Sequence, residues 1–330
     1  MVITRTPLRV SFFGGGTDYP NYFKEYGGAV LSTSIDKYVY VNVTRLGTLF
    51  DHKFRVAYSK TELVKTVDEV QHQSVKACLD HLKINDGMEI SVTTDLPART
   101  GLGSSSSFTV GLLHGLHALE GRLIDKSTLA MEAIHVEQNV IGERVGNQDQ
   151  VAAAIGGLNF ITFRADGTFL AEPLPILAAR KSRLFDHFFL VYTGISRLAD
   201  EVLVEQCANV KSRLVELDQI KYLASEARGI LCSESSPLED FGALLHETWM
   251  QKKKLSSQIT NEVIEKIYDT AQSAGAIGGK LLGAGGGGFL LIFAKPEKHA
   301  DIKSALNAYQ FINFKPDSTG SSVIYYNAGC

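Results

Sequence analysis

Residues 97–108 read PARTGLGSSSSF, and this stretch decides the fold. It follows a β-rich run at 88–94 and leads into residues 104–119, whose apolar side chains recur at helical spacing. A helix that starts directly after a loop presents unpaired backbone N–H groups and the positive end of its dipole. Gly101 and Gly103 carry no Cβ, so the backbone can approach an anion closely. The stretch therefore predicts a phosphate-binding loop, with a plain Ser-rich capped turn as the alternative.

Two familiar nucleotide-binding patterns do not fit this chain. Residues 97–108 lack the Gly-Lys-Ser/Thr ending of a Walker A loop. Lys280 fails the same pattern, because Ala274 stands where the first glycine is required and Leu281 where Ser or Thr is required. Residues 283–288 read GAGGGG and satisfy G-x-G-x-x-G in form, but a β-rich run follows where a dinucleotide-binding fold needs a helix. We interpret them as a second glycine loop, which excludes an NAD-dependent oxidoreductase.

Glycine is abundant and clustered, with 30 glycines against 8 prolines. No repeating period accompanies them, which excludes a collagen or low-complexity chain and points to backbone held close to a ligand. Hydrophobic residues make up 45% and charged residues 21%, as in globular proteins. At about 150 residues per domain, 330 residues predict two domains.

The charge balance limits the classes of partner that the protein can bind. Lys plus Arg total 33 and Asp plus Glu total 36, a net charge of -3, so no basic excess supports non-specific nucleic-acid binding. The four cysteines form no C-x-x-C pair and no zinc spacing, and neither a signal peptide nor an apolar run of membrane-span length is recognisable. We therefore expect a cytoplasmic protein with no membrane and no nucleic-acid partner. A local basic pocket for a phosphorylated small molecule is compatible with this balance.

Hydrophobic periodicity predicts the remaining secondary structure. A change of character near residue 180 predicts a boundary between residues 1–180 and 181–330, although no Pro- or Ser-rich linker marks it. Asp125 or Ser127 is expected to cap the second predicted helix. Strands are predicted at 8–13, 29–44, 88–94, 158–163, 188–192 and 289–293, and helices at 104–119, 127–141, much of 198–275, and 300–308.

Two carboxylates are candidates for chemistry. Glu137 shares a helix face with apolar residues, where an acid is costly unless it is paired or binds a metal; a border position reaching solvent is the alternative. Asp149 enters the apolar segment 151–154, where its proton affinity could matter; an N-cap is its alternative. The pairs His114/His117 and Glu132/His135 have metal-ligand spacing but no matching second half, so we interpret them as surface or packed residues.

Four segments, in this order, resemble the GHMP kinases, the family of galacto-, homoserine, mevalonate and phosphomevalonate kinases. Residues 7–19 (PLRVSFFGGGTDY) are similar to the galactokinase-type opening, in which an Arg-containing strand leads to a Thr-Asp-Tyr sugar contact. Residues 101–105 (GLGSS) are similar to the family's phosphate loop. Residues 135–150 resemble its metal-glutamate helix and Gly-x-x-Asp-Gln turn, and residues 282–289 (LGAGGGGF) its closing glycine loop. The matches span almost the whole chain.

The resemblance implies a mixed α/β (α+β) fold of two domains: a ribosomal-protein-S5-like ATP-binding domain at 1–180 and a ferredoxin-like α+β domain at 181–330. It implies a phosphotransferase that uses ATP and Mg²⁺, whose site lies in the cleft between the domains. By the same resemblance, catalysis falls to Asp149 and Arg9, ATP binding to Pro97, Gly101, Leu102, Gly103, Ser104, Ser105 and Ser106, Mg²⁺ binding to Ser105 and Glu137, and substrate binding to Gly15, Gly16, Thr17, Asp18, Arg197, Gly285 and Gly286.

The sugar-side turn separates subgroups of the family. Galactokinases carry Gly-Glu-His-Thr-Asp-Tyr where this chain reads GGGTDY at 14–19, a variant that resembles the heptose 7-phosphate kinases, as does YTGISR at 192–197. The smaller side chains leave room for a larger substrate that carries its own phosphate. Phosphorylation of the anomeric hydroxyl of D-glycero-D-manno-heptose 7-phosphate, giving heptose 1,7-bisphosphate for activated-heptose synthesis, is therefore implied. Arg197, or Arg99 as the weaker candidate, would meet the substrate phosphate, and a surface or salt-bridged arginine is the alternative.

Three points stay open on the sequence alone. A galactose- or fucose-type sugar 1-kinase is the nearest alternative, and a non-catalytic sugar and ATP sensor on the same fold is a more distant one. Asp149 could act as a true base or only as an electrostatic stabiliser. A homodimer is compatible with the sequence.

Overall fold

The computed structural model describes residues 1–195, 205 and 210–327. Its larger sheet has eight strands, in the order β12-β1-β2-β5-β3-β4, with β6 paired to β2 and β7 to β6. The long strands β1 and β2 are rich in β-branched and aromatic residues and are buried along much of their length. The strands of this sheet are β1 (Val2–Phe13), β2 (Gly28–Arg45), β3 (Phe54–Ala57), β4 (Thr61–Val64), β5 (Met88–Thr94), β6 (Leu158–Phe163), β7 (Phe169–Pro173) and β12 (Ser322–Tyr326).

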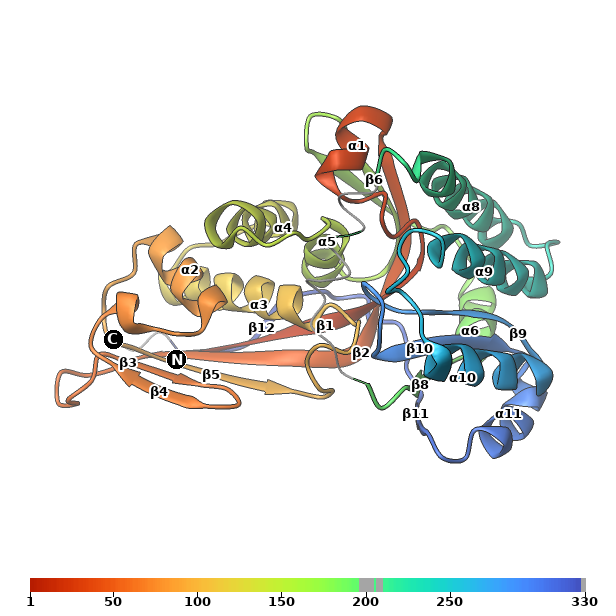
Figure 1. The fold of residues 1–330 in the computed structure, drawn as a ribbon. Coiled ribbons are helices and arrows are strands. Elements are labelled where there is room, and N and C mark those ends of the chain that lie inside the picture. The colour runs from red at the N-terminus through yellow and green to blue at the C-terminus, as the bar shows by residue number, and fades with distance from the viewer. Residues whose placement is uncertain (196–204, 206–209, 328–330) are drawn as a thin grey trace.

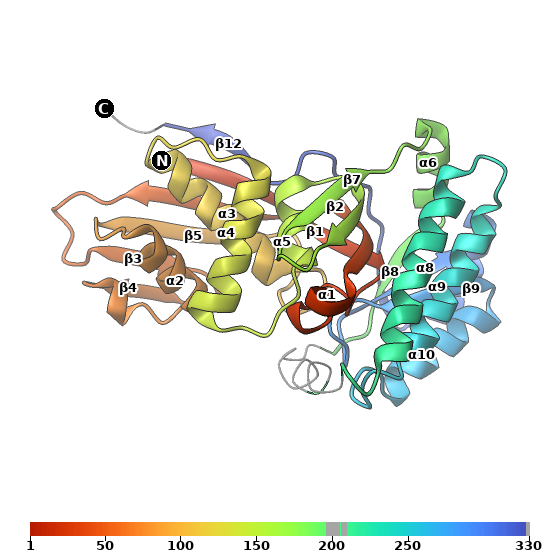
Figure 2. The same ribbon diagram turned by 90° about the horizontal axis from the view of Figure 1, so that it is seen from above.

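Helices cover one face of this sheet (Figures 1 and 2). The helix α3 (Ser104–Leu119) lies against β1 and β2 and is buried almost all round, because α4 and α5 pack on its other side. Asp125 caps α4, as one of the two predicted caps, by accepting hydrogen bonds from the backbone N–H groups of Ser127 and Thr128. The other helices of this part are α1 (Pro20–Tyr26), the 3₁₀ turn Val67–Glu69, α2 (Gln73–Leu82), α4 (Lys126–His135), the π-helical turn Val136–Ile141 and α5 (Gln148–Ile155).

The second sheet is antiparallel, with the order β11-β8-β10-β9. Numbered along the chain, this order is 4-1-3-2, and the helices lie in the two crossovers, which is the ferredoxin-like arrangement that we predicted. It comprises β8 (Phe188–Tyr192), β9 (Ala276–Leu281), β10 (Phe289–Ala294) and β11 (Gln310–Ile312), with α6 (Ala178–Asp186), α8 (Leu214–Cys232), α9 (Leu238–Lys252), α10 (Glu262–Ser273), the 3₁₀ turn Pro296–Lys298 and α11 (His299–Ala305).

The predicted mixed α/β fold of two domains is confirmed. The boundary near residue 180 stays a prediction. One late segment returns across it, because β12 pairs antiparallel with β1, with Val2 opposite Tyr326. The N- and C-terminal ends of the chain therefore lie at the same end of the molecule (Figure 1).

Most predicted elements are present. The strands predicted at 88–94, 158–163 and 188–192 and the helix at 104–119 coincide with β5, β6, β8 and α3. The helix predicted at 127–141 is α-helical only to His135 and then forms the π-helical turn. The predicted helical region 198–275 contains α8, α9 and α10, and residues 196–204 and 206–209 lie outside the described part of the chain.

Candidate active site

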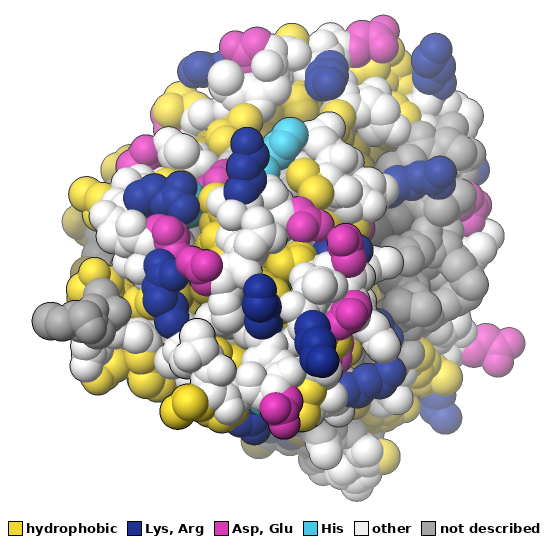
Figure 3. Space-filling view, turned by 90° about the vertical axis from the view of Figure 1, so that its left-hand side faces the viewer, with side chains coloured by type: hydrophobic (Ala, Val, Ile, Leu, Met, Phe, Trp, Pro, Cys, Tyr) yellow, Lys and Arg dark blue, Asp and Glu magenta, His cyan; other side chains and the backbone are white. Residues whose placement is uncertain are grey.

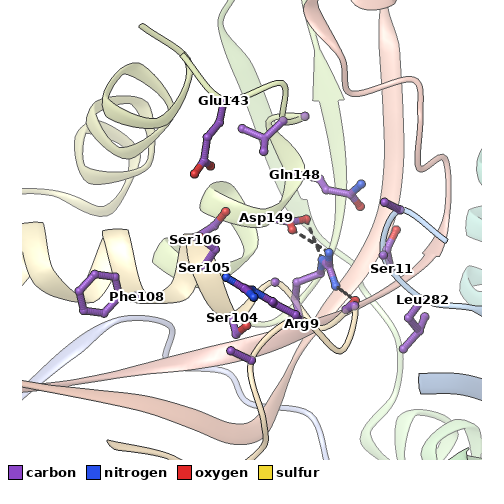
Figure 4. Close-up of a pocket in the computed structure, with 18 of the residues that line it drawn as sticks. Arg9, Ser11, Ser104, Ser105, Ser106, Phe108, Glu143, Gln148, Asp149 and Leu282 are labelled. Atoms are coloured by element: carbon purple, nitrogen blue, oxygen red, sulfur yellow. Dashed lines mark hydrogen bonds and ion pairs between the residues drawn. The ribbon is translucent and has the colours of Figure 1, made fainter. Parts of the chain in front are cut away.

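A cleft of about 1070 Å³ lies where the two sheets meet. Its walls come from the end of β1 and the turn after it, the loop before α3, the start of α5, and the segments that flank β9. Figure 4 shows this cleft with Arg9 and Asp149 near its centre, the serines at the start of α3 on one side, and Ser11 and Leu282 on the other. Segments from the whole length of the chain thus converge on one site.

Arg9 and Asp149 form a bidentate ion pair in the cleft. Arg9 Nε donates to Asp149 Oδ1 at 2.7 Å, and Arg9 Nη2 donates to Asp149 Oδ2 at 2.7 Å. Arg9 Nη1 donates to the carbonyl oxygen of Gly101 at 2.6 Å, so the guanidinium also holds the loop before α3. The Arg9 side chain is 5% exposed and that of Asp149 is 25% exposed, which leaves the carboxylate accessible from the cleft. Such fork-to-fork pairs fix both orientation and charge.

The loop before α3 is shaped by backbone contact. Gly101 has φ +85°, and a Cβ there would lie 2.5 Å from the carbonyl oxygen of Leu282. A side chain at this position is therefore excluded by the second glycine loop, which packs directly on the first. Gly103 is the N-cap of α3, and no side chain caps the helix. The first backbone N–H groups of α3 consequently stay available for an anion at the positive end of the helix dipole.

Glu137 lies behind the start of α3 and is 1% exposed. Its Oε2 accepts hydrogen bonds from Ser106 Oγ at 2.9 Å and from the side-chain amide of Gln150. Its Oε1 has no hydrogen-bond partner among the described residues. Burial raises the pKa of Glu137 to about 7, although the hydrogen bonds from Gln150 and Ser106 oppose this. A buried carboxylate with an unpartnered oxygen fits a cation.

These donors fit Mg²⁺. The ion prefers oxygen ligands, and in phosphoryl-transfer sites it is held by one or two carboxylates together with substrate phosphates and water. Among the described residues no group of three or more His, Cys, Asp or Glu side chains could hold a metal, so a site here would depend on ligand oxygens in this way. Ser105 and Glu137 are the predicted pair, but the hydroxyl that contacts Glu137 is that of Ser106, because Ser105 is exposed toward the cleft.

Asp18 lies in the glycine turn after β1 and lines the cleft. Its Oδ1 accepts from the backbone N–H of Gly16 at 2.9 Å and its Oδ2 from that of Gln148 at 3.2 Å. The residue is fully buried, and burial, with the nearby charge of Asp149, raises the pKa of Asp18 to about 6. A Cβ at Gly146 would lie 2.0 Å from Asp18 Oδ2, so glycine is required for this contact. Asp18 thus locks the sugar-side turn to the start of α5.

Family comparisons agree with this geometry. The model described as the GHMP kinases N terminal domain matches residues 52–157, and that described as GHMP kinases C terminal matches residues 230–311. Together these two stretches cover more than half of the chain. The chain belongs to the GHMP kinases. The predicted family is therefore confirmed, and so is the prediction of a phosphotransferase.

Individual relatives of this GHMP kinase are kinases of small molecules. It is 28% identical over 320 residues to the D-glycero-alpha-D-manno-heptose 7-phosphate kinase of Campylobacter jejuni, covering 93% of each chain. It is 26% identical over 337 residues to the bifunctional fucokinase/GDP-fucose pyrophosphorylase of Arabidopsis thaliana, covering 94% of this chain and 31% of that protein. The solved structure of a D-glycero-D-manno-heptose 1-phosphate kinase from Bacteroides thetaiotaomicron superposes with a TM-score of 0.81 at 22% identity, covering 99% of this chain and 100% of the other.

The structure brings most of the predicted site residues of this GHMP kinase together. Four predicted residues do not line the cleft, and Glu137 lies behind Ser106. Arg197 lies outside the described residues, whereas Arg99 is exposed at the cleft. The predicted residues that line the cleft are Arg9, Gly15, Gly16, Asp18, Gly101, Gly103, Ser104, Ser105, Ser106, Asp149 and Gly285, and those that do not are Pro97, Leu102, Thr17 and Gly286.

Three of the predicted residues that do not line the cleft have structural partners. Thr17 Oγ1 donates to the carbonyl oxygen of Gly14 at 2.8 Å, which holds the glycine turn closed. The carbonyl oxygen of Leu102 accepts from the backbone N–H of Arg9 at 3.0 Å, and that of Pro97 accepts from Thr100 Oγ1 at 2.8 Å. These residues shape the loops, while their neighbours face the cleft.

Among the cleft residues that sequence reasoning missed are two lysines, a histidine and a tyrosine. Lys252 and Lys280 bring buried ammonium groups to the wall from α9 and β9, and His72 and Tyr58 lie at the far end near Phe108. The signal for Lys280 was present, since a lone cation stands between two glycines and two leucines in a buried strand. No comparable signal marks His72, which follows a 3₁₀ turn in an irregular segment.

The outer surface matches the charge balance. On the face shown in Figure 3, Lys and Arg side chains alternate with Asp and Glu, and no broad patch of one sign forms there. In the described part of the chain, the structure contains no helix with the length and apolar character needed to cross a membrane.

Proposed function

We propose that this GHMP kinase transfers the γ-phosphoryl group of ATP to the anomeric hydroxyl of D-glycero-D-manno-heptose 7-phosphate, giving heptose 1,7-bisphosphate. The observation that carries the proposal is the cleft itself. It places a carboxylate–guanidinium pair between a phosphate loop and a glycine turn without bulky side chains. The similarity to the Campylobacter jejuni heptose 7-phosphate kinase supports this substrate.

Nucleotide binding is assigned to the loop before α3. Its uncapped N–H groups and the hydroxyls of Ser104 and Ser105 would hold the phosphates. The adenine base of ATP would lie toward His72, at the end of the cleft beyond the start of α3. The ring of His72 contacts those of Tyr58 and Phe108 there. A related phosphomevalonate kinase from Streptococcus pneumoniae has been solved in complex with phosphomevalonate and AMPPNP, which is consistent with ATP as the donor.

The ion pair is assigned to the chemistry. Phosphoryl transfer depends on positioning and charge stabilisation more than on covalent steps. Asp149 would accept the hydroxyl proton of the sugar, or orient that hydroxyl, and Arg9 would stabilise the negative charge that develops beside it. Asp18 would contact sugar hydroxyls from the glycine turn. Mg²⁺, held through Glu137 with Ser106 or Ser105, would neutralise phosphate charge when bound.

A fucose- or galactose-type sugar 1-kinase is the second candidate. It is favoured by the similarity to the fucokinase of Arabidopsis thaliana over 94% of this chain. Against it, the turn 14–16 carries three glycines, so no side chain there reaches a small unphosphorylated sugar.

A substrate panel separates the two. The purified chain is incubated with ATP and Mg²⁺ and with heptose 7-phosphate, unphosphorylated heptose, galactose, fucose or mevalonate, and ADP formation is followed. We expect the highest kcat/KM with heptose 7-phosphate. A higher value with galactose or fucose would replace the proposal by the second candidate, and ADP formation that persists in an Asp149→Asn variant would reveal a contaminating ATPase.

A further inference from the structure

Two buried lysines face the cleft from the second domain. Lys252, the last residue of α9, is 8% exposed, and Lys280 in β9 is 3% exposed. Both line the cleft, and the charge of Lys280 acts on Lys252, so the two ammonium groups lie near each other. Burial of one lysine is uncommon, and burial of two together needs a physical reason.

Their partners in the chain are neutral. Lys252 Nζ donates to the carbonyl oxygens of Leu281 at 2.9 Å and Gly283 at 2.6 Å, and Lys280 Nζ donates to that of Phe12 at 3.1 Å. Among the described residues neither lysine forms an ion pair, whereas Arg9 has Asp149. An ammonium group has three donors, so Lys280 keeps two for a ligand and Lys252 keeps one.

The charge of this pair is poorly compensated. Burial lowers the pKa of Lys280 to about 7 and that of Lys252 well below its usual range, and the positive charge of Arg9 adds to both effects. Asp18 is the carboxylate that opposes them, and its own pKa is raised by burial. A buried charge without a counter-charge costs several kcal/mol, as a rough figure. A bound anion would remove most of that cost.

A third unsatisfied group lies beside them. Ser11 is 5% exposed and lines the cleft, and its Oγ has no hydrogen-bond partner among the described residues. It immediately precedes Phe12, whose carbonyl oxygen accepts from Lys280. Two lysines and one hydroxyl donor thus line the same cleft, and together they are a donor set that suits a phosphate monoester.

We propose that Lys252, Lys280 and Ser11 bind the phosphate group that the sugar substrate already carries. This assignment rests on the proposed function and names the residues that recognise its substrate. It assigns to these three residues the role that the resemblance implied for Arg197 or Arg99.

The position of Lys252, Lys280 and Ser11 in the cleft indicates that they bind the phosphate of the sugar rather than those of ATP. Ser104, Ser105 and Ser106 lie on one side of the Arg9–Asp149 pair, and Ser11 and Leu282 lie on the other (Figure 4). The lysines belong to the second side, since their acceptors are the carbonyl oxygens next to Ser11 and on either side of Leu282. The carboxylate that acts on both lysines is Asp18 of the sugar-side turn. Glu137, the candidate metal ligand, does not appear among the charges that act on them.

The first test is a KM comparison. We expect Lys280→Met to raise the KM for heptose 7-phosphate by about 10- to 100-fold, the effect of one charge-assisted hydrogen bond, while the KM for ATP and the kcat/KM for unphosphorylated heptose stay unchanged. Lys254→Met is the matched control, because Lys254 is exposed and bonds only to Gln251 in the described part of the chain. Equal losses with the two sugars would overturn the proposal, and so would a loss confined to ATP.

The second test does not depend on turnover. Inorganic phosphate is titrated by calorimetry into the wild type and into Lys280→Met, each saturated with AMPPNP and Mg²⁺. We expect binding to the wild type and at least a tenfold weaker affinity in the variant. Equal affinities, displacement of phosphate by AMPPNP, or no binding to the wild type would overturn the lysine assignment.

The two tests also separate the two proposals. If the wild type does not phosphorylate any heptose, the proposed function fails, and the phosphate titration alone decides the lysine assignment. If heptose 7-phosphate is the preferred substrate and the titration shows no difference, the function stands and the assignment fails.

Discussion

Two groups of charged side chains line the cleft, and their charges are compensated differently. Arg9 on β1 is bound through two hydrogen bonds to Asp149 and one to Gly101, so its charge and orientation are fixed by the chain itself. Lys252 and Lys280 are equally buried but are bound only to carbonyl oxygens. The first site is organised before substrate arrives, as catalysis by positioning requires. The second site has positive charge without a carboxylate partner, which suits the recognition of an anion.

The largest expected effect tests the paired site. Asp149→Asn keeps the size of the side chain but removes the negative charge and the proton acceptor, so kcat should fall by about 10²- to 10⁴-fold. Affinity for ATP, measured by calorimetry, should stay within about threefold, since Asp149 is assigned to the sugar hydroxyl rather than the nucleotide.

The control for this variant is Asp166→Asn, in an exposed turn. It should leave both values unchanged. Near-normal turnover in Asp149→Asn would remove Asp149 from the mechanism and leave the ion pair as a structural link between β1 and α5.

A smaller effect is expected at the candidate metal ligand. Glu137→Gln keeps the oxygen that accepts from Ser106 but removes the charge, so the Mg²⁺ concentration for half-maximal activity should rise by about 10- to 100-fold. A titration of activity with Mg²⁺ at saturating ATP measures this. An unchanged Mg²⁺ requirement would assign Glu137 to packing and direct the search to ligand oxygens alone.

Substitutions at the two charged sites should change the free energy of unfolding differently: Arg9→Met should lower it, and Lys280→Met should not. Arg9→Met leaves Asp149 without its partner and should lower the free energy of unfolding by about 1–3 kcal/mol, a modest value because Asp149 is partly exposed. Lys280→Met removes a buried charge that has no carboxylate partner and should leave the protein equally stable or more stable. Urea unfolding at pH 7 measures both, and a loss of more than 1 kcal/mol, as a rough limit, in Lys280→Met would show that the chain itself satisfies this lysine.

The smallest expected effect is on the pH dependence of stability. The difference in free energy of unfolding between Lys280→Met and the wild type should change with pH. The pKa of Lys280 is lowered in the folded state to about 7 from 10.5, so the folded state binds this proton less tightly than the unfolded state. The wild type should therefore gain stability as the pH rises from about 7 to 10.5. The advantage of Lys280→Met over the wild type should be greatest at pH 7 and shrink toward pH 10. A difference that is independent of pH would contradict an uncompensated charge at Lys280.

Local patterns were sufficient to predict the strand, the glycine loop and the helix between residues 88 and 119. The bounds of β5 and α3 follow from hydrophobic period and glycine position, which depend on neighbouring residues only. The same holds for the cap at Asp125. What local patterns could not give is the pairing of β12 with β1, because these strands are separated by almost the whole chain.

The detailed geometry of the site could not be predicted from the sequence either. Four consecutive serines begin α3, and successive residues of a helix point about 100° apart, so the serine that faces Glu137 depends on how α3 rotates against the sheet. The structure selects Ser106. The helix that carries Glu137 changes to π-helical geometry at Val136, which the spacing of its apolar residues does not reveal. Lys252 and Lys280 meet only because α9 and β9 pack together.

The most direct test of the account is a competition between two sugars that differ only in one phosphate. Heptose 7-phosphate and unphosphorylated heptose are supplied together with ATP, Mg²⁺ and the wild-type chain, and the products are followed by ³¹P NMR. We expect a new anomeric phosphate signal from heptose 1,7-bisphosphate well before any from heptose 1-phosphate. Equal rates for the two sugars, or a signal from the unphosphorylated sugar alone, would contradict it.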